Sequence, residues 1–370
     1  MNSQKRKAEN HEDAPEPKLS KVIATHYNRI EEKGIESRKE SRIYYLRNFN
    51  NWVKAVIIAQ ALTKIQTMNE RKDIRNKSVT VLDIGCGKGG DLRKYRIHGV
   101  ANLVCVDIAD ESLAQCRDRY REMTKLRHKG NLFDAFFIHA DCTRDNLNIK
   151  YKETKGLVEK LGDKNQFDLV SCQFTFHYCF ESLAQAETMI KNIANNLKKD
   201  GLFIGTTPDA NYIVAKARKE GASFGNEVYS VTFKDESITD KNKIVPLFGV
   251  QYNFHLEGCV DCPEFLVHFP TFEKIAEKYG LKLAFARRFE DFYAENHKKD
   301  EEAGLLSRMG ALETFPPGDE PLKGSDDDYI HAEQFFNYYR KEKKLERIGT
   351  LSQSEWEAIN LYLVFAFIKV

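Results

Sequence analysis

The stretch VTVLDIGCGKGGD, residues 79–91, decides the fold of this chain. Its first part, Val79 to Ile84, places apolar side chains close together and predicts a buried β-strand, and the glycines that follow predict a tight turn into a helix. Glycines at positions 85, 87, 89 and 90 let the backbone pass close beneath a ligand at the carboxyl end of the strand. The stretch therefore predicts a nucleoside-binding turn in an open α/β sheet.

The glycines alone leave the ligand open, because Gly85, Gly87 and Gly90 also satisfy the dinucleotide pattern GxGxxG. Asp83 gives the pattern DxGxGxG, which resembles the first motif of the S-adenosylmethionine-dependent methyltransferases. A carboxylate at this turn repels a diphosphate but suits a ligand that carries an amino group and a sulfonium. We therefore expect S-adenosylmethionine rather than NAD, and a methyltransferase rather than an oxidoreductase. A glycine turn that merely packs is the remaining alternative.

Acidic residues also close the next two predicted strands. LVCVD (103–107) ends in Asp107, which lies roughly 20 residues past the glycines and suits hydrogen bonds to ribose hydroxyls. AFFIHAD (135–141) ends in Asp141, which can accept a hydrogen bond from the adenine amino group. Because the carboxyl ends of parallel strands share one edge of a sheet, these acids are expected to face one ligand.

Four further apolar segments complete the predicted sheet. They are residues 167–174, 201–208, 281–289 and the closing run INLYLVFAFIKV, 359–370. Together they predict an α/β fold with a Rossmann-like sheet of seven strands and helices on both faces, its last strand antiparallel, as in methyltransferases of this class. His177 and Tyr178 follow the strand at 167–174, at the edge where binding groups collect. Each could equally be a core or rim residue.

Residues 209–270 break the alternation of strand and helix. Strands at 228–233 and 250–256 predict an inserted β-rich lobe that builds the acceptor side of the site. The lobe contains two histidines and the pair Cys259 and Cys262, but a single CxxC without a second close pair does not predict a metal site. The charged stretch at 294–330, rich in glycine and proline, predicts a mobile surface loop.

Length and amino-acid composition indicate the general class of protein. The chain has 370 residues, 42% of them hydrophobic, which supports one large domain over residues 21–370. The formal net charge of +2 does not indicate a nucleic-acid binder, so a basic surface would have to be local. The eight cysteines are scattered, which favours a reducing compartment, and no apolar run is long enough to predict a membrane span or a signal peptide.

The first 20 residues are polar and predict a disordered tail. Lys5, Arg6 and Lys7 within it could form a nuclear-import signal or a solvated cluster of charge. We expect the protein in the nucleus.

An apolar stripe after the tail predicts a helix that begins near Asn50 or Asn51, either of which is a good N-cap. Lys54 would then lie in the first turn, where a cation opposes the helix dipole unless an anion is near. The carboxylate of the cofactor is the candidate anion, and a solvated surface lysine is the alternative.

Several segments together resemble the eukaryotic messenger-RNA cap guanine-N7 methyltransferases, in order along the chain. They include NFNNWVK (48–54), VLDIGCGKGGDL (81–92), CQFTFHY (172–178), PEFLV (263–267) and LYLVFAF (361–367). The resemblance implies transfer of a methyl group from S-adenosyl-L-methionine to guanine N7 of the GpppN cap of mRNA. It runs from about residue 20 to the end of the chain, which makes it far more specific than the glycine loop alone.

The resemblance also implies two sets of site residues. The cofactor set is Lys54, Asp83, Gly85, Asp107, Asp141, Gln173 and Tyr178, in which Asp83 is the acid of the motif. The cap set is Asn50, Asn51, Lys88, Lys94, Arg119, His177, Glu264 and Tyr362. The charges are consistent with these sets, because the cations suit a triphosphate bridge and Glu264 can accept hydrogen bonds from guanine.

The implied reaction needs no general base, because guanine N7 carries a free lone pair and loses no proton. Catalysis would then rest on orientation and electrostatics, with Glu264, His177 and Tyr178 at the reacting groups. The implied partners are 5'-capped RNA, a small RNA-binding activating subunit and the transcription and capping machinery, with no membrane. A methyltransferase for another acceptor and a non-catalytic cap- or RNA-binding module are the alternatives. The three retained acids argue against the second alternative.

Overall fold

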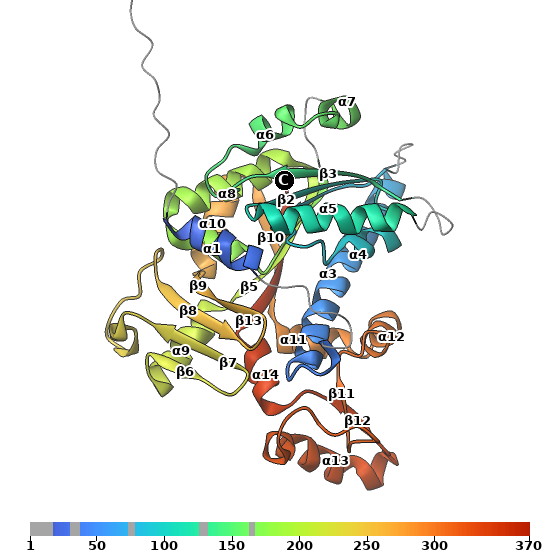
Figure 1. Ribbon diagram of the computed structural model, residues 1–370, viewed down its shortest axis with the longest axis vertical. Helices are drawn as coiled ribbons and strands as arrows, with labels where there is room; N and C mark the ends of the chain where they lie inside the picture. The colour runs from blue at the N-terminus through green and yellow to red at the C-terminus, as the bar shows by residue number, and fades with distance from the viewer. Residues whose placement is uncertain (1–17, 30–37, 73–77, 126–131, 163–166) are drawn as a thin grey trace, which may run out of the picture.

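The computed structural model describes residues 18–29, 38–72, 78–125, 132–162 and 167–370 (Figure 1). Nearly all of the expected polar tail, with Lys5 to Lys7, lies outside the described residues. The first described element is helix α1, Lys18–Arg29, which begins before the expected start of the domain at residue 21.

A seven-stranded sheet forms the centre of the molecule, in the order β10-β13-β5-β4-β1-β2-β3. The strands are β1 (Thr80–Ile84), β2 (Asn102–Asp107), β3 (Asp134–His139), β4 (Phe167–Gln173), β5 (Leu197–Pro208), β10 (Leu281–Arg288) and β13 (Tyr362–Lys369). Neighbours from β5 to β3 pair in parallel, whereas β13 is antiparallel to both β5 and β10. The predicted sheet of seven strands with an antiparallel last strand is confirmed.

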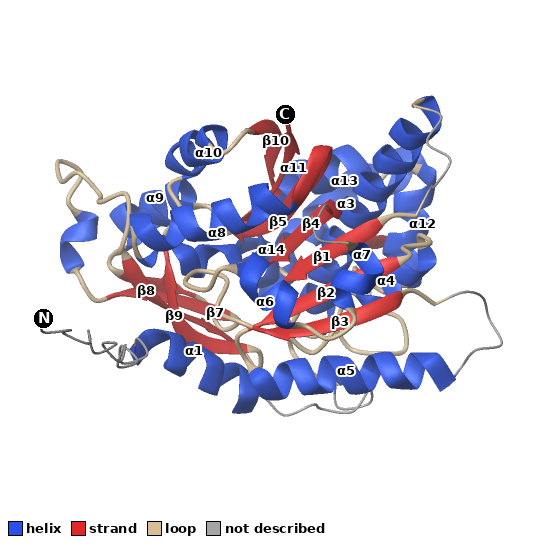
Figure 2. Ribbon diagram, turned by 90° about the horizontal axis from the view of Figure 1, so that it is seen from above, coloured by secondary structure: helices blue, strands red, loops and turns tan. Residues whose placement is uncertain are grey.

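Helices cover both faces of this sheet (Figure 2). Alternate residues of a strand point to opposite faces, so Val81 joins the apolar cluster that contains helix α3 (Tyr44–Arg71), and Leu82 joins the cluster that contains α8 (Leu183–Asn196). The other helices of the sheet region are α4 (Leu92–Ile97), α5 (Asp110–Lys125), α6 (Leu147–Glu153), α7 (Leu157–Leu161), α10 (Phe269–Lys278) and α11 (Phe289–Asn296). With both faces buried, the carboxyl edge of the parallel strands is left to carry the site.

The expected inserted lobe follows β5. Helix α9 (Ala210–Glu220) leads into a second, four-stranded antiparallel sheet in the order β6-β7-β8-β9. Its strands are β6 (Ser223–Gly225), β7 (Tyr229–Phe233), β8 (Gln251–Leu256) and β9 (Val260–Phe265). Only β7 and β8 were expected, because the sequence VDCPEF of β9 lacks alternating apolar residues and contains a proline.

The prediction of a loop over 294–330 is wrong for most of that stretch. It holds helix α12 (Asp300–Arg308), strand β11 (Glu313–Phe315), which pairs with β12 (Ile348–Thr350), and the short 3₁₀ helix η4 (Asp326–Tyr329). The acids in the first turn of α12 and the arginine in its last turn match the helix dipole, so charge that resembled a loop stabilises a surface helix. Helices α13 (Ile330–Lys343) and α14 (Gln353–Ile359) complete this end of the chain.

The predicted start of the second helix is also wrong. Helix α3 begins at Tyr44 rather than at Asn50 or Asn51, because buried Leu46 and Phe49 extend its apolar face toward the N-terminus. Lys54 therefore lies in the helix interior, and the argument from the dipole of the first turn does not apply.

Candidate active site

The glycine loop between β1 and α4 has the backbone that its sequence predicts. Gly85, Gly87 and Gly89 have φ angles of 68°, 50° and 74°, in the left-handed region that favours glycine. A Cβ on Gly85 would lie 2.4 Å from the Thr175 side chain, so only glycine fits beside the loop that follows β4. The N–H of Gly85 donates to the carbonyl of Val106 at 2.8 Å, which fixes the loop on the end of β2.

Asp107 holds the same loop from the end of β2. One carboxylate oxygen accepts a hydrogen bond from the N–H of Gly87 at 2.7 Å, and the other accepts from the N–H of Ala109 at 2.8 Å. Burial raises the pKa of Asp107, although these backbone donors oppose the shift. Asp83, on β1, is buried as well, and burial followed by the charge of Asp91 raises its pKa. Their contacts with a cofactor remain predictions.

Asp91 joins two lysines that the sequence placed in different sets. Lys54 donates to one of its carboxylate oxygens at 3.0 Å, and Lys94 donates to the other at 2.7 Å. Burial alone would raise the pKa of Asp91, but the two ammonium groups lower it to about 2. Lys94 also donates to the side-chain oxygen of Asn51. The sequence analysis placed Asp91 in neither set, although its position at the end of the glycine stretch was an available signal.

Buried Glu264, on β9, and His177, on the 3₁₀ helix η2 (Phe176–Glu181), lie side by side where the lobe meets the central sheet. Glu264 accepts a hydrogen bond from the Tyr252 hydroxyl at 2.8 Å, and its other oxygen lies 3.4 Å from His177 Nε2. Burial raises the pKa of Glu264 to about 8 and lowers the pKa of His177 to about 3. The imidazole is therefore neutral near pH 7, and its contact with Glu264 is not an ion pair.

Helix α1 covers the site from outside the sheet and contributes two residues that the sequence analysis missed. The hydroxyls of Tyr27 and Tyr178 are hydrogen-bonded at 2.9 Å, and the Ser20 hydroxyl donates to Asp141 at 3.2 Å. The helix also contacts β9, where the N–H of Asp261 donates to the His26 ring at 3.4 Å. No motif in the sequence connects this segment with the glycine loop, so only the three-dimensional structure places it there.

Buried polar atoms without a protein partner provide a test of whether the site fits a polar ligand. They include the side-chain oxygens of Gln173 and Asn50 and both ring nitrogens of His177. An unpaired buried donor or acceptor costs roughly 1–3 kcal/mol, which a bound polar ligand would recover. With the glycine cradle, these atoms make the residues present a fit for S-adenosylmethionine and a polar acceptor.

The remaining residues of the cap set lie on three elements. Lys88 is half-buried in the glycine loop, and Arg119 is half-buried on α5. Tyr362 is buried at the start of β13, packed against the rings of Phe174 and Phe289. The roles of all three stay predictions.

The strand order, the glycine loop and the acids at the strand ends define an S-adenosylmethionine-dependent methyltransferase of the α/β class. Residues 10–370 match the sequence profile of the mRNA (guanine-N(7))-methyltransferase domain, and the chain belongs to this family of enzymes. Within the residues that the structure describes, no helix has the length and apolarity needed to cross a membrane.

Relatives with this name come from animals, plants and fungi. The chain is similar to the mRNA cap guanine-N(7) methyltransferase of Drosophila melanogaster, with 43% identity over 354 residues, 94% of this chain and 77% of that protein. The Caenorhabditis elegans protein of the same name is 42% identical over 354 residues, 95% of this chain and 87% of that protein. Among solved structures, the CcbJ methyltransferase from Streptomyces caelestis matches 87% of this chain and 90% of its own at 11% identity and a TM-score of 0.44.

Proposed function

We propose that this protein transfers the methyl group of S-adenosylmethionine to guanine N7 of 5'-capped RNA, and that Glu264 binds the guanine. The observation that carries the proposal is the buried carboxyl of Glu264, held by Tyr252 and facing an imidazole without hydrogen-bond partners. The membership of the mRNA (guanine-N(7))-methyltransferase family supports it.

Glu264 suits the Watson–Crick edge of guanine. A carboxylate can accept hydrogen bonds from the N1 and N2 hydrogens together, which leaves N7 on the opposite side of the base for the methyl donor. In the free protein burial holds the pKa of Glu264 at about 8, and two N–H donors would lower it and favour the ionised form. Guanine binding and ionisation of Glu264 are therefore coupled.

The same carboxylate would act electrostatically during the reaction. The positive charge of the sulfonium passes to the guanine ring as the methyl group moves from sulfur to N7. A carboxylate fixed beside the ring in a dry site stabilises that charge more in the transition state than before it. The aligned geometry of N7, methyl and sulfur supplies the orientation effect, which reaches about 7–11 kcal/mol in favourable cases.

His177 positions the base and is not a proton acceptor in this proposal. Its neutral ring, with a pKa of about 3, can donate or accept one hydrogen bond near pH 7. N7 loses no proton on methylation, so the chemistry requires no general base. The hydroxyl of half-buried Tyr178, on the residue next to His177, is hydrogen-bonded to Tyr27.

We assign the basic residues of the site to two ligands, S-adenosylmethionine and the cap. We assign Lys54, which lies over the glycine loop within 3.7 Å of the Cβ position of Gly90, to the carboxylate of the methionine moiety. Lys94, with Lys88 and Arg119, is assigned to the triphosphate bridge. Asp91 bonds both Lys54 and Lys94 and so fixes the spacing between the two anion sites.

Methyl transfer from labelled S-adenosylmethionine tests the proposal directly. The substrates are GpppA-capped RNA, the same RNA without a cap, and RNA capped with 7-deazaguanosine, which lacks the accepting nitrogen. Label on the first RNA alone is the expected result. Label on the 7-deaza cap would place the methyl group on another atom. A protein that binds the cofactor but labels no RNA, even with the activating subunit added, would contradict the proposed acceptor.

We further propose that the protein acts in the nucleus with a small RNA-binding activating subunit and the capping machinery. The basic residues Lys5 to Lys7 support the location, and the expected substrate supports the partners. Replacing the three residues with alanine in a fluorescent fusion is expected to move the signal to the cytosol. An unchanged distribution would contradict this role of the basic residues.

A further inference from the structure

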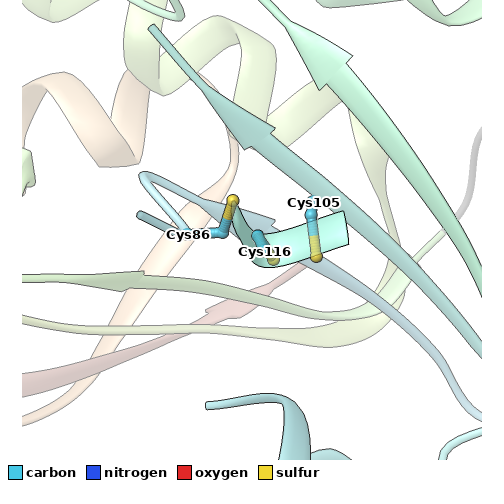
Figure 3. A group of neighbouring side chains, drawn as sticks. All are labelled: Cys86, Cys105 and Cys116. Carbon is cyan, nitrogen blue, oxygen red and sulfur yellow. The ribbon is translucent and has the colours of Figure 1, made fainter. Parts of the chain in front are cut away.

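Three buried thiols meet beneath the glycine loop and have no part in the proposed reaction. Cys86 lies in the loop after β1, Cys105 on β2 and Cys116 on α5, and their three Sγ atoms all lie within 4.8 Å of one another (Figure 3). All three are free cysteines, and Cys86 is the most exposed of them at 9%. We call Cys86, Cys105 and Cys116 the thiol cluster.

The thiol cluster offers three sulfur ligands, which favours a soft ion that binds three ligands. Thiolates prefer soft ions. Structural zinc sites take four ligands, whereas the grouping found among the described residues offers three sulfurs and no histidine or carboxylate. With bonds of about 2.3 Å, the zinc–sulfur length, a pyramidal three-coordinate centre holds its sulfurs roughly 3.5 Å apart. The three Sγ atoms lie within 4.8 Å of one another, so a shift of about 1 Å or less brings them to the spacing of a three-sulfur site.

The charge of the surroundings also indicates which ion the thiol cluster would bind. Asp83 and Asp107 are buried, and the charge of Cys116 contributes to the raised pKa of each, after burial as the main cause. Three thiolates with a monovalent ion would bury two additional negative charges beside these acids, and a divalent ion would leave one. A trivalent centre leaves none, which is the favourable arrangement in a site of low dielectric constant.

We propose that Cys86, Cys105 and Cys116 form a binding site for trivalent arsenic. Arsenous acid, As(OH)₃, exchanges its three hydroxyl groups for three sulfurs, so three As–O bonds break and three As–S bonds form. Each thiol proton leaves with a hydroxyl group as water, and no atom is oxidised or reduced. The product is neutral, and the reagent is small and uncharged.

The cluster also contains the nucleophile that starts this exchange. Hydrogen bonds from Cys105 and Cys86 lower the pKa of Cys116, with smaller help from the charges of Arg119 and Arg117. The Cys116 thiolate, held by two thiol donors, attacks first and displaces hydroxide. This hydroxide takes up the proton that Cys116 gave to the solvent, so the complete exchange with the two neighbouring thiols still releases three molecules of water.

Arsenic in the cluster would act on the cofactor loop. Cys86 stands between Gly85 and Gly87, and a Cβ on Gly89 would lie 2.7 Å from the Cys116 sulfur, so the loop packs directly on the cluster. Bonds that draw the three sulfurs together would shift this backbone. We expect weaker binding of S-adenosylmethionine, a consequence that depends on the cofactor site described above.

Native mass spectrometry of the full chain with sodium arsenite tests the site without any need for methyl transfer. The expected adduct is heavier than the free protein by the mass of one arsenic atom less three hydrogen atoms. This mass increase requires three As–S bonds. Cys105→Ala and Cys116→Ala should each lose it, and any residual two-sulfur adduct would keep a hydroxyl group. Cys179→Ala, which removes a buried thiol outside the cluster, should retain it.

Isothermal titration calorimetry then tests the effect on the loop. Wild-type protein with arsenite is expected to bind S-adenosylmethionine at least 10-fold more weakly, and Cys116→Ala should be insensitive to arsenite. No three-sulfur adduct, or an adduct that survives Cys116→Ala, would overturn the site. The adduct together with unchanged cofactor affinity would overturn its effect on the loop.

Discussion

At the scale of single residues, Glu264 shows how burial assigns chemistry to a side chain. The same glutamate on an exposed strand would ionise near pH 4.5, whereas here its pKa is about 8 and its hydrogen-bond partner is Tyr252. A buried carboxyl with capacity for further donors suits a ligand with two adjacent N–H groups, which is the role that we propose for Glu264. Glu264 is therefore the residue whose replacement best separates guanine binding from cofactor binding.

Replacing Glu264 with glutamine should damage the reaction with the cap far more than cofactor binding. Glutamine keeps the size but places an N–H donor toward guanine and removes the negative charge, so kcat/KM for capped RNA should fall about 100-fold or more. The Kd for S-adenosylmethionine should change less than 3-fold. Steady-state kinetics and calorimetry measure the two quantities. Tyr252→Phe, which leaves the carboxyl in place, is the control and should lose less. Equal losses in both quantities for Glu264→Gln would contradict the assignment.

Cap affinity should depend on pH in a way that an ordinary glutamate would not produce. Because the free protein holds the Glu264 proton up to about pH 8, guanine binding below that pH must release a proton. The affinity for a GpppA dinucleotide should therefore rise as pH increases from 6 to 8 and level off above it. Fluorescence titration at each pH measures the slope. Glu264→Gln should bind weakly and without this slope, and a flat profile in the wild type would count against the ionisation step.

Site residues could be predicted from the sequence where the local backbone structure requires a particular residue type. Gly85 and Asp107 follow from the turn and from the end of a strand, and the structure places both in the loop that they were expected to form. Asp91 was missed because its role depends on Lys54 and Lys94 approaching it, from positions 37 residues before it and one turn after it. Such pairing is a property of the folded chain and leaves no pattern in the sequence.

At the scale of elements, the glycine loop depends on two separable demands, backbone conformation and space. Gly85 and Gly87 both have positive φ angles, but a Cβ on Gly85 would meet Thr175, whereas a Cβ on Gly87 would meet nothing within 4 Å. Gly87→Ala should cost about 1–2 kcal/mol of unfolding free energy from backbone strain alone. Gly85→Ala should cost about 1–3 kcal/mol more from the clash. Urea unfolding of the two variants without ligand measures the difference, and equal costs would show that Thr175 moves away freely.

Helix α1 should behave as part of the cofactor site. Removing its two hydrogen bonds with Tyr27→Phe and Ser20→Ala takes a partner from Tyr178 and from Asp141. A loss of about 0.5–1.5 kcal/mol per bond, or about 1–3 kcal/mol for both, predicts an affinity for S-adenosylmethionine that is lower by about 5- to 140-fold. Calorimetry measures the affinity. Val22→Ala, on the exposed side of the same helix, is the matched control and should bind normally. Unchanged affinity in the double variant would separate α1 from the site.

Elements were predictable where apolar periodicity is strong and local. The buried strands of the central sheet are rich in apolar residues, so their positions followed from the sequence. Strand β9 was missed because its residues include Pro263 and Asp261, and pairing with β8 rather than local preference makes it a strand. Helix α12 was missed because all its residues are at least partly exposed, so no apolar stripe marked it.

At the scale of the whole molecule, the sheet order brings distant parts of the sequence to one edge. Residues 85, 107 and 173 end or follow neighbouring parallel strands, and the lobe after β5 carries Glu264 toward them. The topology class was predictable from the alternation of strands and helices together with the apolar C-terminal strand. The position of α1 was not, because its contacts with Asp141 and Tyr178 span more than 100 residues of sequence.

The acceptor site should also shape the stability of the ligand-free protein as pH changes. A carboxyl whose pKa is raised on folding, here Glu264 from 4.5 to about 8, stabilises the fold below its unfolded pKa and loses that contribution as pH rises through 8. A histidine whose pKa is lowered, here His177 from 6.5 to about 3, destabilises the fold as pH falls below 6.5. These two effects oppose each other below pH 6.5, and of the two only the loss of stability from Glu264 continues above it.

Stability should therefore decline between pH 6.5 and pH 8. With the pKa of Glu264 at about 8, the folded protein keeps over this interval one proton that the unfolded chain has released. This difference corresponds to a loss of about 2 kcal/mol in the free energy of unfolding. Glu355, whose pKa is raised to about 7 mainly by burial, adds to the lower part of the decline. Urea unfolding at pH 6.5 and pH 8 measures it. Glu264→Gln cannot titrate and should lose most of the slope, so a variant with the wild-type slope would show that the decline arises elsewhere. If Glu264→Gln loses most of the slope, the carboxyl that we assign to guanine also accounts for a measurable part of how the stability of the free protein depends on pH.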